Sequence, residues 1–226
     1  MDLSAQTFFS LDQFQHSAIF QGTRYAWEAL EALAEYLKKQ RLGKIEIELS
    51  SSVYLVNKEF ISIGKGVMVE PGAYIQGPCI IGNNSIIRHG AYVRGNVITG
   101  EACVIGHASE VKHSILLNHA CISHFNYVGD SILGNGVNLG AGVKCANFRL
   151  DHKLVSVHAG NEKIITRLKK LGAVIGDGTQ IGCNCVTNPG AIIGKNVICH
   201  PCLTIGGYVP SYGKVKPAQK SIVVEK

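Results

Sequence analysis

Residues that could do chemistry gather in the middle of the sequence, where an otherwise regular apolar pattern is broken. Six polar side chains there are too many to be filler for an apolar stack: His119, His124, Asn126, Tyr127, Asn138 and Asn147. Histidine is the side chain that most often transfers protons in enzymes. Further upstream, Arg94 and Lys112 are two cations of the kind that hold phosphate oxygens.

These residues lie within a sequence that repeats an aliphatic residue every six positions. With skips and two slips of one residue, the repeat runs through Ile63, Val69, Ile75, Ile81, Ile87, Val93, Ile105, Val111, Leu116, Ile122, Val128, Leu133, Leu139, Ile175, Ile181, Ile193, Cys199 and Ile205. Glycine often follows the aliphatic residue, and a small residue often precedes it by two positions. A helix needs apolar spacings of three and four, and an ordinary strand needs alternation. A period of six is instead typical of a parallel β-helix.

Short strands that turn every six residues place one large and one small residue inward on each side. Three sides close a coil of about eighteen residues, and successive coils stack at about 4.8 Å. The number of hexads predicts about seven coils. We therefore predict an all-β solenoid, a left-handed parallel β-helix of hexapeptide repeats.

The coil length also predicts which residues are neighbours in space. Arg94 and Lys112 each follow an inward aliphatic residue and should project from one face in adjacent coils. His124 belongs to a column of residues that each stand two positions after an inward aliphatic, and Ala141 continues this column one coil further. The other histidines of the column are His89 and His107. His124 and Ala141 should therefore lie a few ångströms apart.

Three segments lie outside the repeat. Residues 1–60 are expected to form an N-terminal unit with an amphipathic helix over 23–41 and opening strands over 44–60. The helix should pack against the β-helix (61–206) or cap its open end, because solenoids need terminal caps. The interruption at 147–172 predicts a protruding β-hairpin with strands over 153–157 and 163–166. Residues 207–226 form a tail, with an edge strand over 221–225.

The composition limits the classes of partner. The chain has 226 residues and a net charge of +6 that is not concentrated in one long run, which argues against nucleic acid and is compatible with anionic small molecules. No apolar stretch approaches the roughly twenty residues of a membrane span. The N-terminus lacks the basic region of a signal peptide, so a cytoplasmic protein is expected.

Eight cysteines raise the question of a zinc site. Cys185 and Cys199 occupy inward positions of the repeat, whereas Cys183 and Cys202 should point outward. Four thiolates that face two ways cannot form a tetrahedron. The sequence favours free thiols in a reducing cytosol.

Four segments carry a resemblance to a known family: Gly90–Arg94 (GAYVR), His107–Lys112 (HASEVK), Ser123–Asp130 (SHFNYVGD) and Val137–Gly142 (VNLGAG). From about Gly72 to Ile205 the chain resembles the acetyltransferase half of the bifunctional N-acetylglucosamine-1-phosphate uridyltransferase/glucosamine-1-phosphate acetyltransferases. The hexads alone are shared by many acyltransferases, but the third and fourth segments together are more specific.

The resemblance implies an acetyl-CoA-dependent N-acetyltransferase for an amino-sugar 1-phosphate, most simply glucosamine 1-phosphate on the route to UDP-N-acetylglucosamine. It implies His124 as the general base and the Ala141 amide as donor to the thioester oxygen. It assigns the sugar phosphate to Arg94, Lys112, Tyr127, Asn138, Asn147 and Lys153. It assigns further contacts to acetyl-CoA or the sugar to Cys183 and Pro201. It also implies a homotrimer with sites at the seams and acetyl transfer without a metal.

The sequence departs from the family after Asn147, where Phe148 and Arg149 replace the usual Asn-Tyr-Asp-Gly turn. The sequence around the hairpin resembles that of sugar-phosphate nucleotidyltransferases that end in a left-handed β-helix. No segment of these 226 residues resembles the uridyltransferase half. The identity of the sugar, the need for a separate uridyltransferase and the role of residues 1–45 therefore stay open.

Three other functions remain possible at this point. His119 and His124, with an earlier histidine such as His89, resemble the ligand spacing of γ-type carbonic anhydrases, which would make the protein a metal hydratase. A longer acyl donor or another amino sugar is a second alternative. A non-catalytic scaffold or regulatory subunit is the third.

Overall fold

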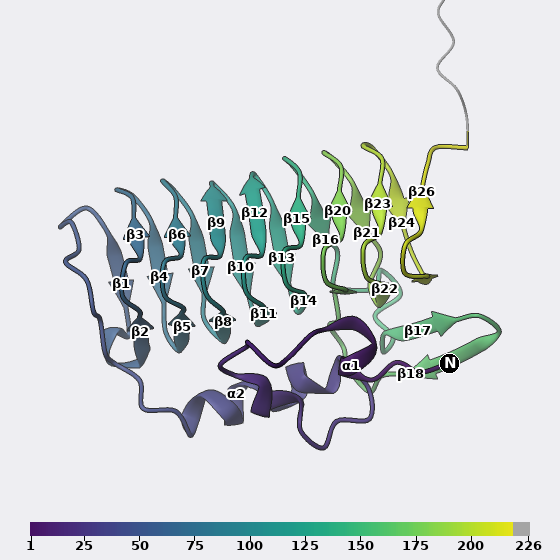
Figure 1. Ribbon diagram of the computed structural model, residues 1–226, viewed down its shortest axis with the longest axis horizontal. Helices are drawn as coiled ribbons and strands as arrows, with labels where there is room; N and C mark the ends of the chain where they lie inside the picture. Colours follow the sequence, from purple (N-terminus) through teal and green to yellow (C-terminus); the bar gives the residue numbers. More distant parts are fainter. Residues whose placement is uncertain (219–226) are drawn as a thin grey trace, which may run out of the picture.

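The computed structural model describes residues 1–218, and the strand expected over 221–225 lies outside them. The chain winds into a parallel β-helix, as Figure 1 shows. Each of its three sides is an eight-stranded sheet. All pairs within these sheets are parallel and join successive coils. The predicted left-handed β-helix is confirmed, with eight strands on each side rather than seven.

The first sheet contains β1 (Tyr54–Val56), β4 (Tyr74–Gln76), β7 (Tyr92–Arg94), β10 (Glu110–Lys112), β13 (Tyr127–Gly129), β16 (Lys144–Cys145), β21 (Val186–Thr187) and β24 (Thr204–Ile205). The second sheet contains β2 (Ile61–Ile63), β5 (Cys79–Ile81), β8 (Val97–Thr99), β11 (Ser114–Leu116), β14 (Ile132–Leu133), β19 (Ala173–Ile175), β22 (Ala191–Ile193) and β25 (Tyr208–Val209). The third sheet contains β3 (Met68–Val69), β6 (Ile86–Ile87), β9 (Val104–His107), β12 (Cys121–His124), β15 (Asn138–Leu139), β20 (Gln180–Ile181), β23 (Ile198–Cys199) and β26 (Lys214–Val215). The β-helix therefore extends beyond the expected range of 61–206 at both ends.

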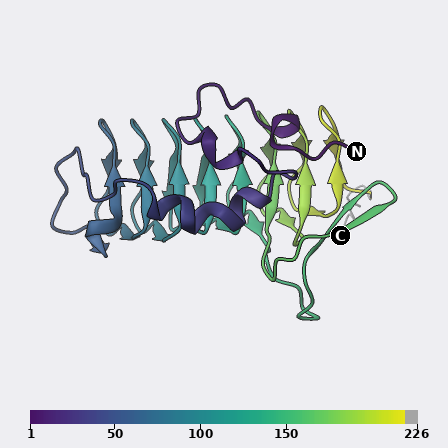
Figure 2. The same cartoon turned by 90° about the horizontal axis from the view of Figure 1, so that it is seen from below.

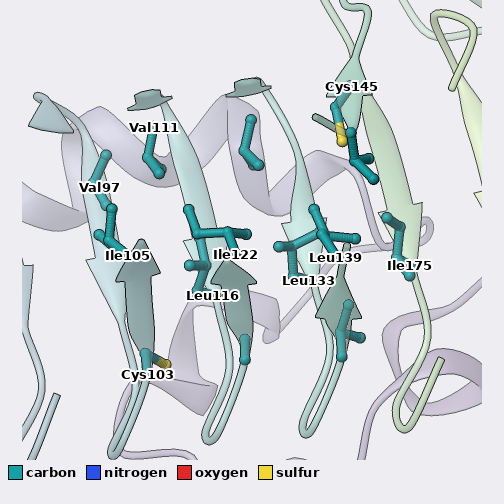
Figure 3. Packing of buried hydrophobic residues seen from close by; sticks show 14 of the residues in the cluster. Val97, Cys103, Ile105, Val111, Leu116, Ile122, Leu133, Leu139, Cys145 and Ile175 are labelled. Atoms are coloured by element: carbon teal, nitrogen blue, oxygen red, sulfur yellow. The ribbon is translucent and has the colours of Figure 1, made fainter. Parts of the chain in front are cut away.

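The interior is filled by the residues that carry the six-residue repeat. Their side chains stack from coil to coil, as Figure 3 shows for Ile105, Ile122 and Leu139. All of the repeat residues are buried except Val69 in β3 of the third sheet, which is half-buried. The smaller inward positions include Cys79, Cys103 and Cys185, and these thiols are buried and free as expected.

The second sheet is buried on its outer side as well. Its strands β8, β11, β19 and β22 are buried at all three positions, because an N-terminal strap (residues 1–41) and the segment 155–171 pack on this sheet in one apolar cluster. Within that segment, β17 (Ser156–Ala159) lies against β22. The strap contains α1 (Ala5–Phe8), the 3-10 helix η1 (Ser17–Phe20) and α2 (Glu28–Lys38). Figure 2 shows α2 lying along the coils, so the helix covers a face and does not cap an end. A second 3-10 helix, η2 (Lys58–Phe60), precedes the second sheet.

The helix expected over 23–41 is shorter in the structure. The N–H groups of Arg24 and Tyr25 donate to the Glu28 carboxylate at 2.6 and 3.1 Å, which holds the residues before α2 in a turn. Polar contacts also tie the strap to the coils. The Asn118 side chain donates to the Gln13 carbonyl at 2.8 Å, and the Ser10 N–H donates to Asp177 at 2.7 Å.

Two buried histidines at the strap predict how the stability of the folded protein depends on pH. Burial lowers the pKa of His16 and of His113 below their usual value. As the pH falls, these imidazoles therefore become protonated at a higher pH in the unfolded chain than in the native state. The stability from the neutral imidazoles is complete above the unfolded pKa of about 6.5 and is lost as the pH falls below it. Thermal unfolding at pH values from about 8 to 5 should show a falling Tm. His16→Gln should reduce this slope, and an unchanged slope in that variant would contradict the role of His16.

The interruption of the repeat forms the predicted hairpin, with β17 (Ser156–Ala159) and β18 (Glu162–Ile165). Its turn is tighter than expected, because Ala159 pairs with Glu162 and leaves only Gly160 and Asn161 between the strands. Gly160 has φ +61°, a conformation that glycine adopts without strain. Buried Val155 and Val157 belong to the same apolar cluster as the strap, which anchors the hairpin on the second sheet.

Candidate active site

Four of the expected site residues belong to the first sheet. Arg94, Lys112 and Tyr127 lie in its strands, and Asn147 follows β16 by two residues. Strands β7 and β10 pair Val93 with Val111, so Arg94 and Lys112 lie in adjacent coils on one face. This neighbourhood agrees with the eighteen-residue spacing. Each cation has a carboxylate partner: Arg94 Nη1 lies 2.6 Å from Glu110, and Lys112 Nζ lies 2.7 Å from Asp130. The Arg94–Glu110 pair is partly exposed, whereas the Lys112–Asp130 pair is largely buried.

Asp130 connects three of the expected residues. It is only 6% exposed, and its Oδ2 accepts hydrogen bonds from Lys112 and from the Asn147 side chain. Asn147 also donates to the Tyr127 hydroxyl at 3.0 Å. Burial raises the pKa of Tyr127, and the hydrogen bond from Asn147 opposes this effect. Tyr127 therefore stays a neutral hydroxyl that can donate a hydrogen bond to a ligand.

His124 lies at the corner where the third sheet passes into the first. Its side chain is exposed, and the ring of the next residue, Phe125, packs edge-on against His107 at 5.2 Å. His107 in turn stacks on His89 at 5.5 Å. The predicted column is thus present in the backbone, where His124 pairs with His107. Phe125 occupies the place of the third ring, which leaves His124 free of the stack.

Ala141 follows His124 in the next coil of this corner, as expected. The Gly142 N–H donates to the His124 carbonyl at 2.8 Å, which fixes the two residues side by side. The Ala141 N–H has no acceptor among residues 1–218. An exposed histidine and an unused backbone donor in adjacent coils of one corner suit acyl transfer, in which a base and an oxyanion donor act around one carbon.

Cys183 and Pro201 continue the same corner toward the C-terminus. The Asn184 N–H donates to the Ala141 carbonyl at 2.8 Å, and the Cys202 N–H donates to the Cys183 carbonyl at 2.9 Å. Both Cys183 and Pro201 are exposed. They therefore line a path along the corner that starts at Ala141.

Two expected residues lie apart from this group. Asn138 is on the third sheet, where it pairs with Cys121 and Gln180. Lys153 is exposed in the loop before β17, and its N–H lies 3.3 Å from Asp151. The structure thus brings Arg94, Lys112, Tyr127 and Asn147 together and leaves Asn138 and Lys153 outside that network.

Glu110 and Asp130 were not assigned a role from the sequence, although both stand inside the motif segments. The signal for Asp130 was available, because it follows Lys112 by eighteen residues, which is one residue beyond Gly129, the strand partner of Lys112. Glu110 was harder to find, since Arg94 reaches it diagonally across sixteen residues.

The histidines that would serve a metal hydratase do not converge within one chain. His119 has φ +62° at the corner between the second and third sheets, whereas His124 lies at the next corner. Among residues 1–218, no group of three or more His, Cys, Asp or Glu side chains is placed to hold a metal ion. No helix in this part of the chain is long and apolar enough to span a membrane.

Known proteins are similar in sequence to the part of the chain that contains most of the candidate site residues. The family described as GMPPB C-terminal domain matches residues 75–171. A bifunctional sugar-1-phosphate nucleotidylyltransferase/acetyltransferase from Sulfurisphaera tokodaii is 41% identical over 80 residues, which are 35% of this chain and 20% of that protein. The bifunctional protein GlmU of Methanococcus maripaludis is 43% identical over 75 residues, which are 33% and 18% of the two chains. Over about a third of its length, this chain is similar to the bifunctional GlmU proteins.

The finding confirms the resemblance to bifunctional sugar-phosphate enzymes that the motif segments indicated. The matched part spans about a fifth of the length of these relatives. Among solved structures, UDP-N-acetylglucosamine acyltransferase from Campylobacter jejuni aligns with 74% of this chain and 69% of its own, at 15% identity and a TM-score of 0.39. The acetyltransferase domain of PglB from Neisseria gonorrhoeae in complex with acetyl coenzyme A aligns with 81% of this chain and 58% of its own, at 13% identity and a TM-score of 0.31.

Proposed function

We propose that this protein is an acetyl-CoA-dependent N-acetyltransferase for an amino-sugar 1-phosphate, with glucosamine 1-phosphate as the simplest substrate. The observation that carries the proposal is that exposed His124 and Ala141, whose N–H has no acceptor among residues 1–218, lie in adjacent coils at one corner, where the Gly142 N–H donates to the His124 carbonyl. The names of the GlmU-like relatives, which include acetyltransferases, support the same class of reaction.

The residues of the corner account for the chemistry. Acetyl-CoA supplies the acetyl thioester. Neutral His124 accepts a proton from the sugar amine as the amine attacks the carbonyl carbon. The Ala141 N–H donates to the thioester oxygen as negative charge develops there. The path along Cys183 and Pro201 is open for the rest of the CoA molecule, because both residues are exposed.

The first sheet accounts for the phosphate. Arg94 and Lys112 offer two neighbouring cations, and Glu110 and Asp130 hold them in place until a phosphate dianion competes for them. Tyr127 lies three residues after His124, between the corner and Lys112, and can donate to the sugar or phosphate. Asn138 and Lys153 lie outside this network, so in this proposal they act from neighbouring copies in a homotrimer.

The proposal is tested by CoA release from acetyl-CoA with glucosamine 1-phosphate, galactosamine 1-phosphate and glucosamine as acceptors. Turnover with the first or second and not with the unphosphorylated sugar would support it. Light scattering should give about three times the chain mass of 24.3 kDa. Lack of turnover with any acceptor in a folded protein would sink the proposal and favour the scaffold function.

Lys112→Ala gives a second test within the same assay. The Lys112 side chain is 17% exposed, and removal of its ammonium leaves the Asp130 carboxylate without this cation. We expect KM for the sugar phosphate to rise about tenfold or more, because charge-assisted hydrogen bonds contribute about 1.5–3 kcal/mol. Lys38→Ala, which removes a surface lysine from α2, should leave KM unchanged. An equal KM in both variants would mean that Lys112 does not contact the phosphate.

A further inference from the structure

The hairpin insertion carries most of the excess positive charge of the protein. Residues 148–170 contain six basic residues and two acidic ones, so four of the six net positive charges fall within 23 of the 226 residues. All six basic side chains are at least partly exposed. A concentration of one sign of charge at this density attracts anions and raises their local concentration.

Four of these cations converge on one depression of about 420 Å³: Arg149, Lys153, Lys163 and Lys169. They come from three different segments, namely the loop before β17, strand β18 and the return to the β-helix. A volume of this size falls within the range of small-molecule pockets. The cations therefore surround a hollow, as groups that bind one common anion do.

The depression has little internal charge compensation. Arg149 forms a two-pronged pair with Asp151, with Nε–Oδ1 at 2.8 Å and Nη2–Oδ2 at 2.6 Å. Within residues 1–218, no carboxylate lies within 4.0 Å of the ammonium groups of Lys153, Lys163 and Lys169. Mutual repulsion of these lysines would be relieved by a ligand with several negative charges.

Apolar side chains complete the walls. Leu154 and Ile165 line the same depression and are 40% and 62% exposed. Exposed apolar groups beside converging cations fit a ligand that combines a flat apolar part with phosphates. A nucleotide has this combination, whereas inorganic phosphate does not.

The depression adjoins one edge of the candidate active site, because Arg149 follows Asn147 by two residues, but it lies away from the other site residues. The hairpin is anchored on the second sheet through Val155 and Val157, whereas Arg94, Lys112 and His124 lie on or beside the first sheet. Figure 1 shows the hairpin projecting from the end of the coils that carries the C-terminal strands. Arg149, Lys163 and Lys169 are therefore not among the residues proposed to hold the sugar phosphate, whereas Lys153 is proposed to reach the sugar phosphate of a neighbouring copy.

We propose that this depression binds a nucleotide that carries two or more phosphate groups. Two sources share this chemistry: a free nucleoside di- or triphosphate, and the phosphorylated ADP end of CoA. The second source rests on the proposed acetyl transfer, and the first does not. Lys163 and Lys169 would contact the phosphates, and Leu154 and Ile165 would pack against the base.

Isothermal titration with ADP, CoA and pyrophosphate, without an acceptor sugar, tests the proposal. ADP and CoA should bind the wild type, and pyrophosphate should bind more weakly than ADP. Lys163→Ala/Lys169→Ala should weaken nucleotide binding about tenfold or more, since it removes two charged contacts. Lys163→Arg/Lys169→Arg should retain binding. CoA at least tenfold tighter than ADP would identify the source as CoA, and equal affinities would identify a free nucleotide.

The matched control is Lys39→Ala/Lys58→Ala, which removes two exposed lysines far from the hairpin and changes the net charge equally. Equal weakening in the two alanine variants would overturn the proposal, because general charge would then explain binding. Absence of binding by all three ligands to the wild type would overturn it as well. Circular dichroism of each variant shows that it is folded. Binding is read without turnover, so this test and the acetyl-transfer assay fail independently.

Discussion

Replacing His124 with alanine should lower kcat for acetyl transfer by a factor of about 10² to 10⁴, the range for loss of a general base. The imidazole is exposed and is free of the ring stack that His89, His107 and Phe125 form at this corner. KM for acetyl-CoA should change little, because the Ala141 N–H remains. CoA release under saturating substrates measures the effect.

The matched control is His119→Asn, which changes another exposed histidine only five residues away. Asparagine tolerates the φ of +62° at this position, so the backbone is not strained. This control also tests the metal-hydratase alternative, which requires His119. If the His119 variant loses activity and the His124 variant keeps it, the assignment of the base is wrong.

A single methyl group at Gly106 should destabilise the protein more than most surface or core changes. A Cβ at this position would lie 1.4 Å from the Ser123 carbonyl oxygen in the next coil. The coils cannot separate locally, because the backbone ladder joins β9 to β12 on both sides of the contact. We expect Gly106→Ala to cost about 3 kcal/mol or more, and to lower Tm by about 6–12 °C.

Gly136→Ala separates the effect of the clash from that of backbone strain. Gly136 has φ +63° and no atom within 4 Å of an added Cβ, so the substitution should cost only about 1 kcal/mol. Thermal unfolding of both variants measures the difference. Equal Tm values for the two variants would show that the coils can spread to accept a side chain at Gly106. Because Ser123 precedes His124, the Gly106 variant should also lose activity in the fraction that folds.

The sequence was sufficient for those parts of the site that follow from the length of a coil. The neighbourhoods of Arg94 with Lys112 and of His124 with Ala141 were both predicted, because inward aliphatic residues fix the register of the strands. A shift by one residue would turn every buried side chain outward. The buried positions were predictable for the same reason.

Other features depend on contacts that no periodicity encodes. The amphipathic pattern of α2 indicates an apolar face, but it does not tell which sheet that face covers. The second sheet was identifiable only in hindsight, from strands such as β19 and β22 that are apolar at consecutive positions. The ion pair of Arg94 with Glu110 depends on side-chain conformation, since the two residues are not in register.

The strap changes how the β-helix is expected to unfold. In a simple solenoid each coil contacts only its neighbours, so terminal coils can fray while the middle stays folded. Here the strap joins distant coils: Phe8 and Ser10 bond to Asp177, while Leu37 belongs to the same apolar cluster as Ile98. Loss of one end would release contacts along the whole second sheet. The chain should therefore unfold as one cooperative unit despite its linear architecture.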